Sequence, residues 1–234
     1  AIKDSLIKKY MQKKSVLDIG SGAGGDIPKY EKHGISQVVG VNIVNVQYSH
    51  NKRKMRFYKA NKPNYNIKNI ISKDPVKTFD VVNCQFAFHY FFASQQLFER
   101  FMQNVKDTLK PEGVLVLTFL DGAKVRNLLG SKTTFDNPVF SIRQGNSPKN
   151  RQNPFGHKVA VMLKGTKYFE TPSNEYLVDP KALDMLMGGH GFVRQDVRSF
   201  ESYCKEFSSL CNEMSPQEKE YSFLNISAVY KRTT

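Results

Sequence analysis

Four glycines crowd into the nine residues DIGSGAGGD at positions 18–26, directly after the apolar run SVL. Each glycine loses more conformational freedom on folding than any other residue, so this cluster is costly unless bare backbone is required. The residues before it favour a strand, and those after it, DIPKYEKHG at 26–34, favour a helix. A glycine-rich turn between a strand and a helix is typical of nucleotide-binding α/β folds, in which the ligand lies over the carboxyl end of the strand.

Strand-like runs alternate with helical patterns through the first 130 residues. Four short runs rich in β-branched residues and apolar on both faces cover 15–19, 37–43, 79–84 and 113–120. An amphipathic segment at 94–110 separates the last two and is followed by Pro111. Buried strands with intervening helices predict an α/β fold with a mostly parallel, doubly wound sheet.

The composition changes at about residues 130–178, where short alternating runs are interrupted by Gly, Asn and Pro turns. This pattern predicts an inserted antiparallel β-lid. A helix at about 179–189, a strand at 191–199, a helix at about 199–213 and a strand at 222–231 are expected to follow. Residues 1–234 are therefore predicted to form a single domain that carries the lid as an insertion.

Charge and cysteine content restrict the class of protein. Lys and Arg outnumber Asp and Glu by 35 to 21, a net charge of +14, which favours a polyanionic partner such as nucleic acid over a membrane surface. No apolar run approaches the roughly 18 residues of a membrane-spanning helix. Cys84, Cys204 and Cys211 lack CxxC or His-rich spacing, so reduced thiols in a cytosolic protein are expected, without a metal site.

The acid that precedes the glycine loop helps to identify its ligand. The spacing GSGAGG does not by itself separate dinucleotides from other adenosine ligands. A carboxylate such as Asp18 suits a pyrophosphate poorly, but it suits the sulfonium and ammonium charges of S-adenosyl-L-methionine (SAM). A nicotinamide enzyme would place an acid about 20 residues beyond the glycines, where this chain has Asn42.

Several segments together resemble one family. VLDIGSGAGGDIPKY resembles the first motif of SAM-dependent methyltransferases, and its GGDxxK ending resembles the mRNA cap guanine-N7 methyltransferases. FDVVNCQFAFHYFF, FGHK, NEYLV and EYSFLNISAVYK extend the likeness over almost the whole chain, which looks closest to the methyltransferase domains of the capping enzymes of large cytoplasmic DNA viruses. The resemblance implies a Rossmann-like class I SAM-dependent methyltransferase fold. It also implies methyl transfer from SAM to guanine N7 of a GpppN cap, with S-adenosyl-L-homocysteine as product.

The resemblance also implies a set of cofactor-binding residues. They are Lys3, Asp18, Gly20, Gly22, Asn42, Asn61, Gln85, Phe86 and Tyr90. Lys3 would reach the methionine carboxylate. Asn42 and Asn61 stand where the family has acids for the ribose and the adenine, and an uncharged acceptor weakens each bond by about 1 kcal/mol. We therefore expect SAM binding to persist with reduced affinity.

A second set of residues is expected to bind the cap. It consists of Lys29, His89, Tyr90, Glu175 and Tyr221. The Glu175 carboxylate would accept hydrogen bonds from guanine N1–H and N2–H₂, and Lys29 would lie near the cap phosphates. Because guanine N7 carries a lone pair and no proton, no general base is expected, and Glu175, His89 and Tyr221 would align the reactants.

Partners, location and alternatives complete the expectations. The resemblance implies capped RNA as partner, guanylyltransferase and triphosphatase domains in the same polypeptide, and no membrane. It also implies a cytoplasmic location, in the host cytoplasm and the virion for a viral protein. The absent initial Met predicts a domain excised from a larger protein. Two alternatives stay open: an RNA- or cap-binding SAM fold with weak catalysis, suggested by Asn42 and Asn61, and a SAM methyltransferase with another substrate.

Overall fold

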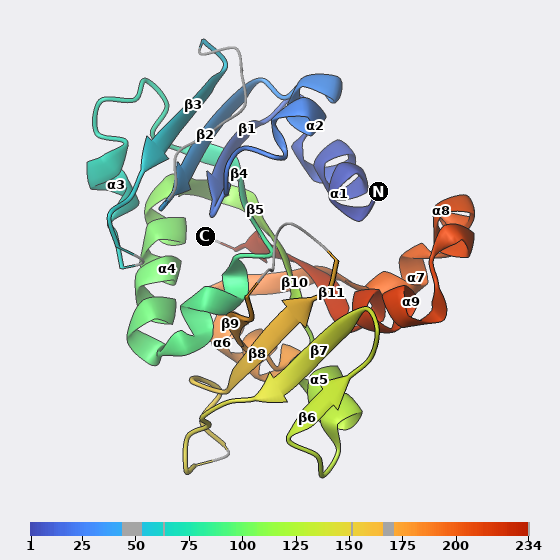
Figure 1. Cartoon of the computed structure of the whole chain (residues 1–234). Helices are drawn as coiled ribbons and strands as arrows, with labels where there is room; N and C mark the ends of the chain where they lie inside the picture. The colour runs from blue at the N-terminus through green and yellow to red at the C-terminus, as the bar shows by residue number, and fades with distance from the viewer. Residues whose placement is uncertain (44–52, 63, 151, 166–170, 234) are drawn as a thin grey trace.

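A seven-stranded sheet forms the centre of the computed structural model, which describes residues 1–43, 53–62, 64–150, 152–165 and 171–233 (Figure 1). The strand order is β10-β11-β5-β4-β1-β2-β3. The strands are β1 (Ser15–Ile19), β2 (Gln37–Asn42), β3 (Met55–Lys59), β4 (Phe79–Gln85), β5 (Leu109–Leu120), β10 (Phe192–Ser199) and β11 (Asn225–Arg232). Strands β1 to β5 pair in parallel, whereas β11 lies between β5 and β10 and is antiparallel to both. The predicted mostly parallel sheet is confirmed.

Helices cover both faces of this sheet, because the strands are apolar on both sides. On one face α1 (Ile2–Met11) and α2 (Ile27–Lys32) contribute Leu6, Ile7, Met11, Ile27 and Tyr30 to a buried cluster. On the other face lie α3 (Ile67–Ile70), α4 (Gln95–Thr108) and α6 (Pro180–Gly189), with the 3₁₀ helix η1 (Phe88–Ala93). The remaining helices are α5 (Gly122–Leu129), α7 (Phe200–Tyr203), α8 (Ser208–Glu213) and α9 (Pro216–Phe223). The arrangement is the doubly wound one expected from the sequence.

The predicted insertion forms a second, antiparallel sheet of four strands, below the central sheet in Figure 1. Its strands are β6 (Thr134–Asp136), β7 (Phe140–Gln144), β8 (Lys158–Leu163) and β9 (Ser173–Tyr176), in sequential order. One face of this lid sheet packs on α5 through a separate core that includes Phe140, Ile142, Val159 and Val161. The lid thus has its own apolar support next to the central sheet.

Several predicted element boundaries are wrong, including the strand expected from 113, which begins at Leu109. The helix expected over 199–213 is divided into α7 and α8. The strand expected from 222 begins at Asn225, because α9 continues to Phe223 after a capping box formed by Ser215 and Glu218. The helix expected to 110 ends at Thr108, because Leu109 is buried and already pairs with Phe79 as the first residue of β5.

The expectation of three reduced cysteines is also wrong. The break between α7 and α8 brings Cys204 and Cys211 to a Cα–Cα distance of 5.4 Å, within disulfide range, and the two are bonded. Cys84 on β4 is a free, buried thiol. Among the helices of the described residues, none combines the length and apolar character that crossing a membrane requires. The same residues contain no group of three or more His, Cys, Asp or Glu side chains that could hold a metal ion.

Candidate functional site

The glycine loop after β1 packs directly on the segment after β4. Gly20 has φ +78°, and a Cβ added there would lie 2.4 Å from the Ala87 Cβ, so only glycine fits at this contact. Gly22 has φ +57° and no atom within 4 Å of the position a Cβ would take. The loop therefore joins the carboxyl ends of two neighbouring parallel strands and leaves open space above Gly22. This is the edge at which α/β folds bind their ligands.

A buried polar network lies beneath this loop. Asn83 on β4 donates from Nδ2 to Asp18 Oδ1 at 2.9 Å and to the Tyr30 hydroxyl at 3.0 Å. Asp18 is almost completely buried, and this burial, with repulsion from Asp26, raises its pKa to about 6. Asn83 was not singled out from the sequence, although a polar residue inside the apolar run FDVVNC was a signal that could have found it.

The same network orients Gln85. Asn83 uses both Nδ2 bonds toward Asp18 and Tyr30, so its Oδ1 accepts from Gln85 Nε2 at 2.9 Å. Gln85 must then present its own Oε1 to the site, and this buried oxygen has no hydrogen-bond partner among the described residues. The Ser21 hydroxyl in the glycine loop is buried and unpartnered in the same way. Buried acceptors without partners are rare in native proteins and indicate a place for a donor group of a ligand.

Phe86 is held in an unusual backbone conformation next to Gln85. Its φ is +56°, and its backbone N–H donates to both the carbonyl and the hydroxyl oxygen of Thr118 at 3.0 Å. The ring stays 40% exposed, lies edge-on to Phe200 and has the Lys3 Nζ 5.4 Å from its centroid. A strained non-glycine residue with an exposed ring is a feature that clusters at binding sites.

The two lysines predicted to contact ligands instead share one carboxylate. Lys3 Nζ from α1 and Lys29 Nζ from α2 lie 2.7 Å from Oδ2 and Oδ1 of Asp26. Burial opposes ionisation of Asp26, but the two lysines outweigh it and hold the pKa of this carboxyl below its usual value. The structure thus brings Lys3 and Lys29 together at the start of α2, and their expected contacts with the cofactor and the cap stay predictions.

Four of the five predicted cap-binding residues, all except Lys29, converge from three distant segments. His89 and Tyr90 lie on η1, Glu175 on β9 and Tyr221 on α9. His89 Nε2 is 3.8 Å from Glu175 Oε2, which is longer than a hydrogen bond, and neither ring nitrogen of His89 has a partner among the described residues. The Tyr90 hydroxyl lies 3.3 Å from the Ser173 hydroxyl, two residues before Glu175 on the same strand.

Burial of this group disfavours the charged forms of its titratable side chains. It lowers the pKa of His89 to about 3 and raises the pKa of Glu175 to about 7. Burial also raises the pKa of Tyr221, with the nearby charge of Glu175 as the second cause, and the Tyr221 ring packs 5.2 Å from that of Phe140 on the lid. Buried polar groups without protein partners suit a flat polar ligand that offers its own donors.

The two asparagines lie at the ends of the next two strands. Asn42 is the last residue of β2, and its carbonyl accepts from the Ala60 N–H at 2.7 Å. Asn61 follows β3 and is exposed. Both lie at the carboxyl edge of the sheet, on the side away from β4, where an extended ligand over Gly22 could reach them. Their predicted roles toward ribose and adenine stay predictions.

Comparisons with known proteins identify relatives of the whole chain. A family model described as the mRNA (guanine-N(7))-methyltransferase domain matches residues 1–222. The mRNA cap guanine-N(7) methyltransferase of Schizosaccharomyces pombe is 28% identical over 218 residues, which cover 85% of this chain and 59% of that protein. A probable mRNA-capping enzyme of Acanthamoeba polyphaga mimivirus is 28% identical over 262 residues, which cover 91% of this chain and 22% of that protein. The chain thus spans only part of the length of these relatives.

Solved structures with a similar fold agree on the architecture. The CcbJ methyltransferase from Streptomyces caelestis matches with a TM-score of 0.63 at 13% identity, covering 99% of this chain and 88% of that one. A SAM-dependent methyltransferase from Mesorhizobium loti matches with a TM-score of 0.62 at 13% identity, covering 99% and 96%. At this identity the likeness shows the fold alone, and the predicted Rossmann-like class I methyltransferase fold is confirmed.

Proposed function

This chain belongs to the mRNA cap guanine-N7 methyltransferase family, and on that premise we propose that it methylates N7 of the terminal guanine of GpppN-capped RNA with SAM. The observation that carries the proposal is the group formed by the buried His89 and Glu175 with the more exposed Tyr90 and Tyr221, next to the segment on which the glycine loop packs. Its members come from three segments far apart in the sequence, and both ring nitrogens of His89 are buried without a hydrogen-bond partner among the described residues. Such an arrangement favours a specific polar ligand over a purely structural role.

The residues around Gly22 fit SAM. Gly20 and Gly22 provide bare backbone, and the orphaned oxygens of Ser21 and Gln85 are acceptors that suit the donors of an ammonium group. When bound, SAM supplies an electrophilic methyl group on a positively charged sulfur. Asp18 is placed to offset positive charge from beneath the loop, and the open edge beyond Asn42 leaves room for an adenosine.

Glu175 is proposed to read the guanine edge. An ionised carboxylate only accepts hydrogen bonds, and guanine offers N1–H and N2–H₂ as donors on one edge. His89, kept neutral by burial, can donate from one ring nitrogen and accept at the other, so it can bind the purine without exchanging a proton. Tyr90 and Tyr221 would contact the base through their rings and hydroxyls.

No residue needs to remove a proton in this reaction. N7 of guanine attacks through a lone pair, so the task of the protein is to hold the nucleophile in line with the methyl group. Positive charge develops on the purine during the transfer, and an ionised Glu175 bound to its edge stabilises that charge. A ribose 2′-O enzyme would need a base instead, and the buried group offers only Glu175 and a His89 with a strongly lowered pKa.

The wider setting is proposed from the family. Capped RNA is the proposed partner, together with guanylyltransferase and triphosphatase domains in the same polypeptide, in keeping with the mimivirus relative named as an mRNA-capping enzyme. A cytoplasmic location is proposed on the same ground. The bond between Cys204 and Cys211 argues against it, since disulfides are uncommon in reducing compartments.

Transfer of labelled methyl from SAM to GpppA and to GpppG-capped RNA tests the proposal, with GTP and uncapped RNA as controls. Nuclease digestion would locate the label, which is expected on N7 of the terminal guanine.

Glu175→Ala should lower turnover by at least about 100-fold, because it removes an interaction that strengthens as charge develops. His89→Ala should act mainly through cap binding and raise KM. SAM binding with no transfer to any capped substrate would instead favour the RNA- or cap-binding alternative, and transfer independent of the cap would favour another substrate.

A further inference from the structure

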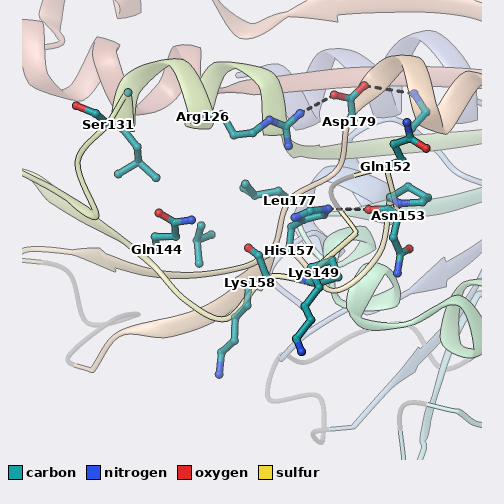
Figure 2. Close-up of a pocket in the computed structure, with 17 residues that line it drawn as sticks. Arg126, Ser131, Gln144, Lys149, Gln152, Asn153, His157, Lys158, Leu177 and Asp179 are labelled. Carbon is teal, nitrogen blue, oxygen red and sulfur yellow. Dashed lines mark hydrogen bonds and ion pairs between the residues drawn. The ribbon is translucent and has the colours of Figure 1, made fainter.

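A second pocket lies outside the group that contains Glu175. Its volume is about 950 Å³, at the upper end of the range for ligand pockets, and it lies between the lid strands β7 and β8, helix α5 and the start of α6 (Figure 2). Residues 147–149, 152–154 and 157, which lie between β7 and β8 in the sequence, form much of its wall. The proposed cofactor and cap sites do not use this pocket, although the family-like segment FGHK contributes His157 and Lys158 to its lining.

The pocket carries an excess of positive charge. Asp179 provides the only carboxylate among the described residues of the lining, and it is fully engaged. Its Oδ2 pairs with Arg126 at 2.6 Å, and its Oδ1 accepts from the N–H groups of Lys181 and Ala182 at the start of α6. Lys149 and Lys158 have no ion-pair partner among the residues that the structure describes. Figure 2 shows both lysine side chains pointing the same way, away from the Arg126–Asp179 pair. Two uncompensated ammonium groups on one wall favour an anionic ligand.

The rest of the lining is neutral and rich in hydrogen-bonding groups. Ser131, Gln144, Ser147, Gln152 and Asn153 all line the pocket. His157 donates from Nε2 to the Asn153 carbonyl at 2.7 Å, and this bond fixes the ring against the wall. Lysine ammonium, hydroxyl and side-chain amide groups are those that bind phosphate oxygens and sugar hydroxyls of nucleic acids. Among the described residues that line the pocket none is Phe, Tyr or Trp, so the lining favours contacts with the backbone over stacking on bases.

The pocket wall is continuous with the proposed cap site. The Gly156 N–H donates to the carbonyl of Phe92, the Phe155 ring packs against the Phe92 ring, and Phe92 belongs to η1, which carries His89 and Tyr90. Val159 lines the pocket and pairs across β8 and β9 with Glu175. A ligand that extends from the cap around the lid could therefore contact both sites.

We propose that this pocket binds the phosphate–ribose backbone of the single-stranded RNA that follows the cap, with Lys149 and Lys158 as its phosphate contacts. The inference rests on the proposed function for its choice of ligand, but RNA binding is measurable without methyl transfer. Because backbone contacts carry no sequence information, the pocket would hold transcripts of any sequence. It would add affinity for long capped RNA without changing the chemistry at guanine.

The test uses the full chain and the double variant Lys149→Glu/Lys158→Glu. Its affinity for an uncapped, single-stranded RNA of about 20 nucleotides should fall by about tenfold or more. The slope of log K against log salt concentration should become less steep by about 1.4, the value for two phosphate contacts on a single strand. KM for capped RNA of that length should rise by a similar factor, while kcat and KM for the dinucleotide GpppA stay at the wild-type values. Thermal unfolding would verify that the variant is folded.

A matched control keeps the same change in net charge at another place. Lys73 and Lys205 are exposed lysines outside the pocket, and Lys73→Glu/Lys205→Glu should lose clearly less RNA affinity.

Equal losses in both variants would overturn the proposal, and so would wild-type RNA affinity in Lys149→Glu/Lys158→Glu. A polyglutamate peptide that displaces RNA from the wild type and fails to bind the pocket variant would assign the pocket to an acidic protein instead. Wild-type protein that binds RNA but does not methylate GpppA would refute the proposed function alone.

Discussion

The rate of the proposed reaction is expected to depend on the protonation state of Glu175. Burial raises its pKa to about 7, so the carboxylate that guanine requires is lost as the pH falls through that value. We expect kcat/KM for GpppA to fall about tenfold per pH unit below pH 7 and to reach a plateau above it. Initial rates between about pH 5.5 and 8.5, at saturating SAM, measure this. A flat profile in the wild type would contradict the assignment.

Glu175→Gln is the matched control for that profile, because it keeps the shape of the side chain and removes the titration. Its activity should be low and independent of pH over the same range. The pKa of Glu175 is higher in the folded protein than in the unfolded chain. The protonated carboxyl group therefore stabilises the folded state at pH below the pKa in the unfolded chain, and this stabilisation is lost as the pH rises through about 7. The variant should therefore unfold at a higher temperature than the wild type at pH 8, with a smaller difference at pH 5, as calorimetry can measure.

Asn83 is expected to strengthen SAM binding because it orients the side chain of Gln85. It bridges Asp18 and Tyr30 to Gln85, and Asn83→Ser would remove the bond that aims the Gln85 oxygen into the site. Loss of one buried hydrogen bond corresponds to about 1 kcal/mol, or roughly a fivefold weaker Kd for SAM by calorimetry. Gln85→Ala and the double variant complete a cycle, in which the two effects should not add. Additive effects would show that Asn83 does not position Gln85.

Sequence reasoning predicted Asp18 and Gln85, which lie at two ends of the buried polar network, but not Asn83, which connects them. Asp18 was predicted from the positive charges of SAM, and Gln85, His89 and Glu175 were predicted from the resemblance to the family. Asn83 lies in the apolar run FDVVNC, but its role depends on Tyr30 and Asp18, which come from other elements. The pairing of Lys3 and Lys29 on Asp26 could not be predicted either, because it requires the position of α1 relative to α2.

The turn between β1 and α2 gives a test at the scale of one element. Gly20→Ala introduces both a strained φ and an overlap with Ala87, whereas Gly22→Ala introduces only the strained φ. The first substitution should lower the free energy of unfolding by roughly 2–4 kcal/mol and the second by roughly 1–2 kcal/mol. Urea unfolding of both variants measures the difference. Equal losses would mean that the loop moves away from the segment after β4 without cost.

Elements whose pattern is local were predicted well, and those that depend on tertiary contacts were not. The strand at 15–19 was predicted with its boundaries, and those at 37–43 and 79–84 to within one residue, because buried parallel strands are apolar on both faces. The lid was predicted from its turns. The break between α7 and α8 and the disulfide across it were not, since each depends on how that segment packs beside β10 and β11.

At the scale of the whole molecule, α1 connects parts that are far apart in the sequence. Lys3 binds Asp26 near the glycine loop, Tyr10 donates to Asp196 on β10, and Ser5 donates to Glu206 beyond α7. Leu6 anchors the helix in the core beneath. Displacement of α1 should therefore disturb the proposed cofactor site as well as the fold.

Two leucine truncations separate these effects. Leu6→Ala and Leu129→Ala should each lower the free energy of unfolding by about 2–5 kcal/mol, because both side chains are buried. Only Leu6→Ala should also weaken SAM binding, by about fivefold or more, since Leu129 lies in the separate core of the lid. Calorimetric titration with SAM at a temperature at which both variants are folded measures this. Equal SAM affinity in the two variants would refute a role for α1 in holding the loop.

The position of β11 has a consequence for biosynthesis. This strand fills the interior of the central sheet between β5 and β10, although it is the last of the seven in the sequence. Until the ribosome has released residue 232, the β5 edge, which includes Leu115, Leu117 and Phe119, has no partner strand. Exposed apolar edges recruit other strands, so nascent chains that stall before this point should associate with chaperones or with one another. The sheet closes only after β11 has emerged from the ribosome, so this sheet is completed much later than the synthesis of β1 to β5.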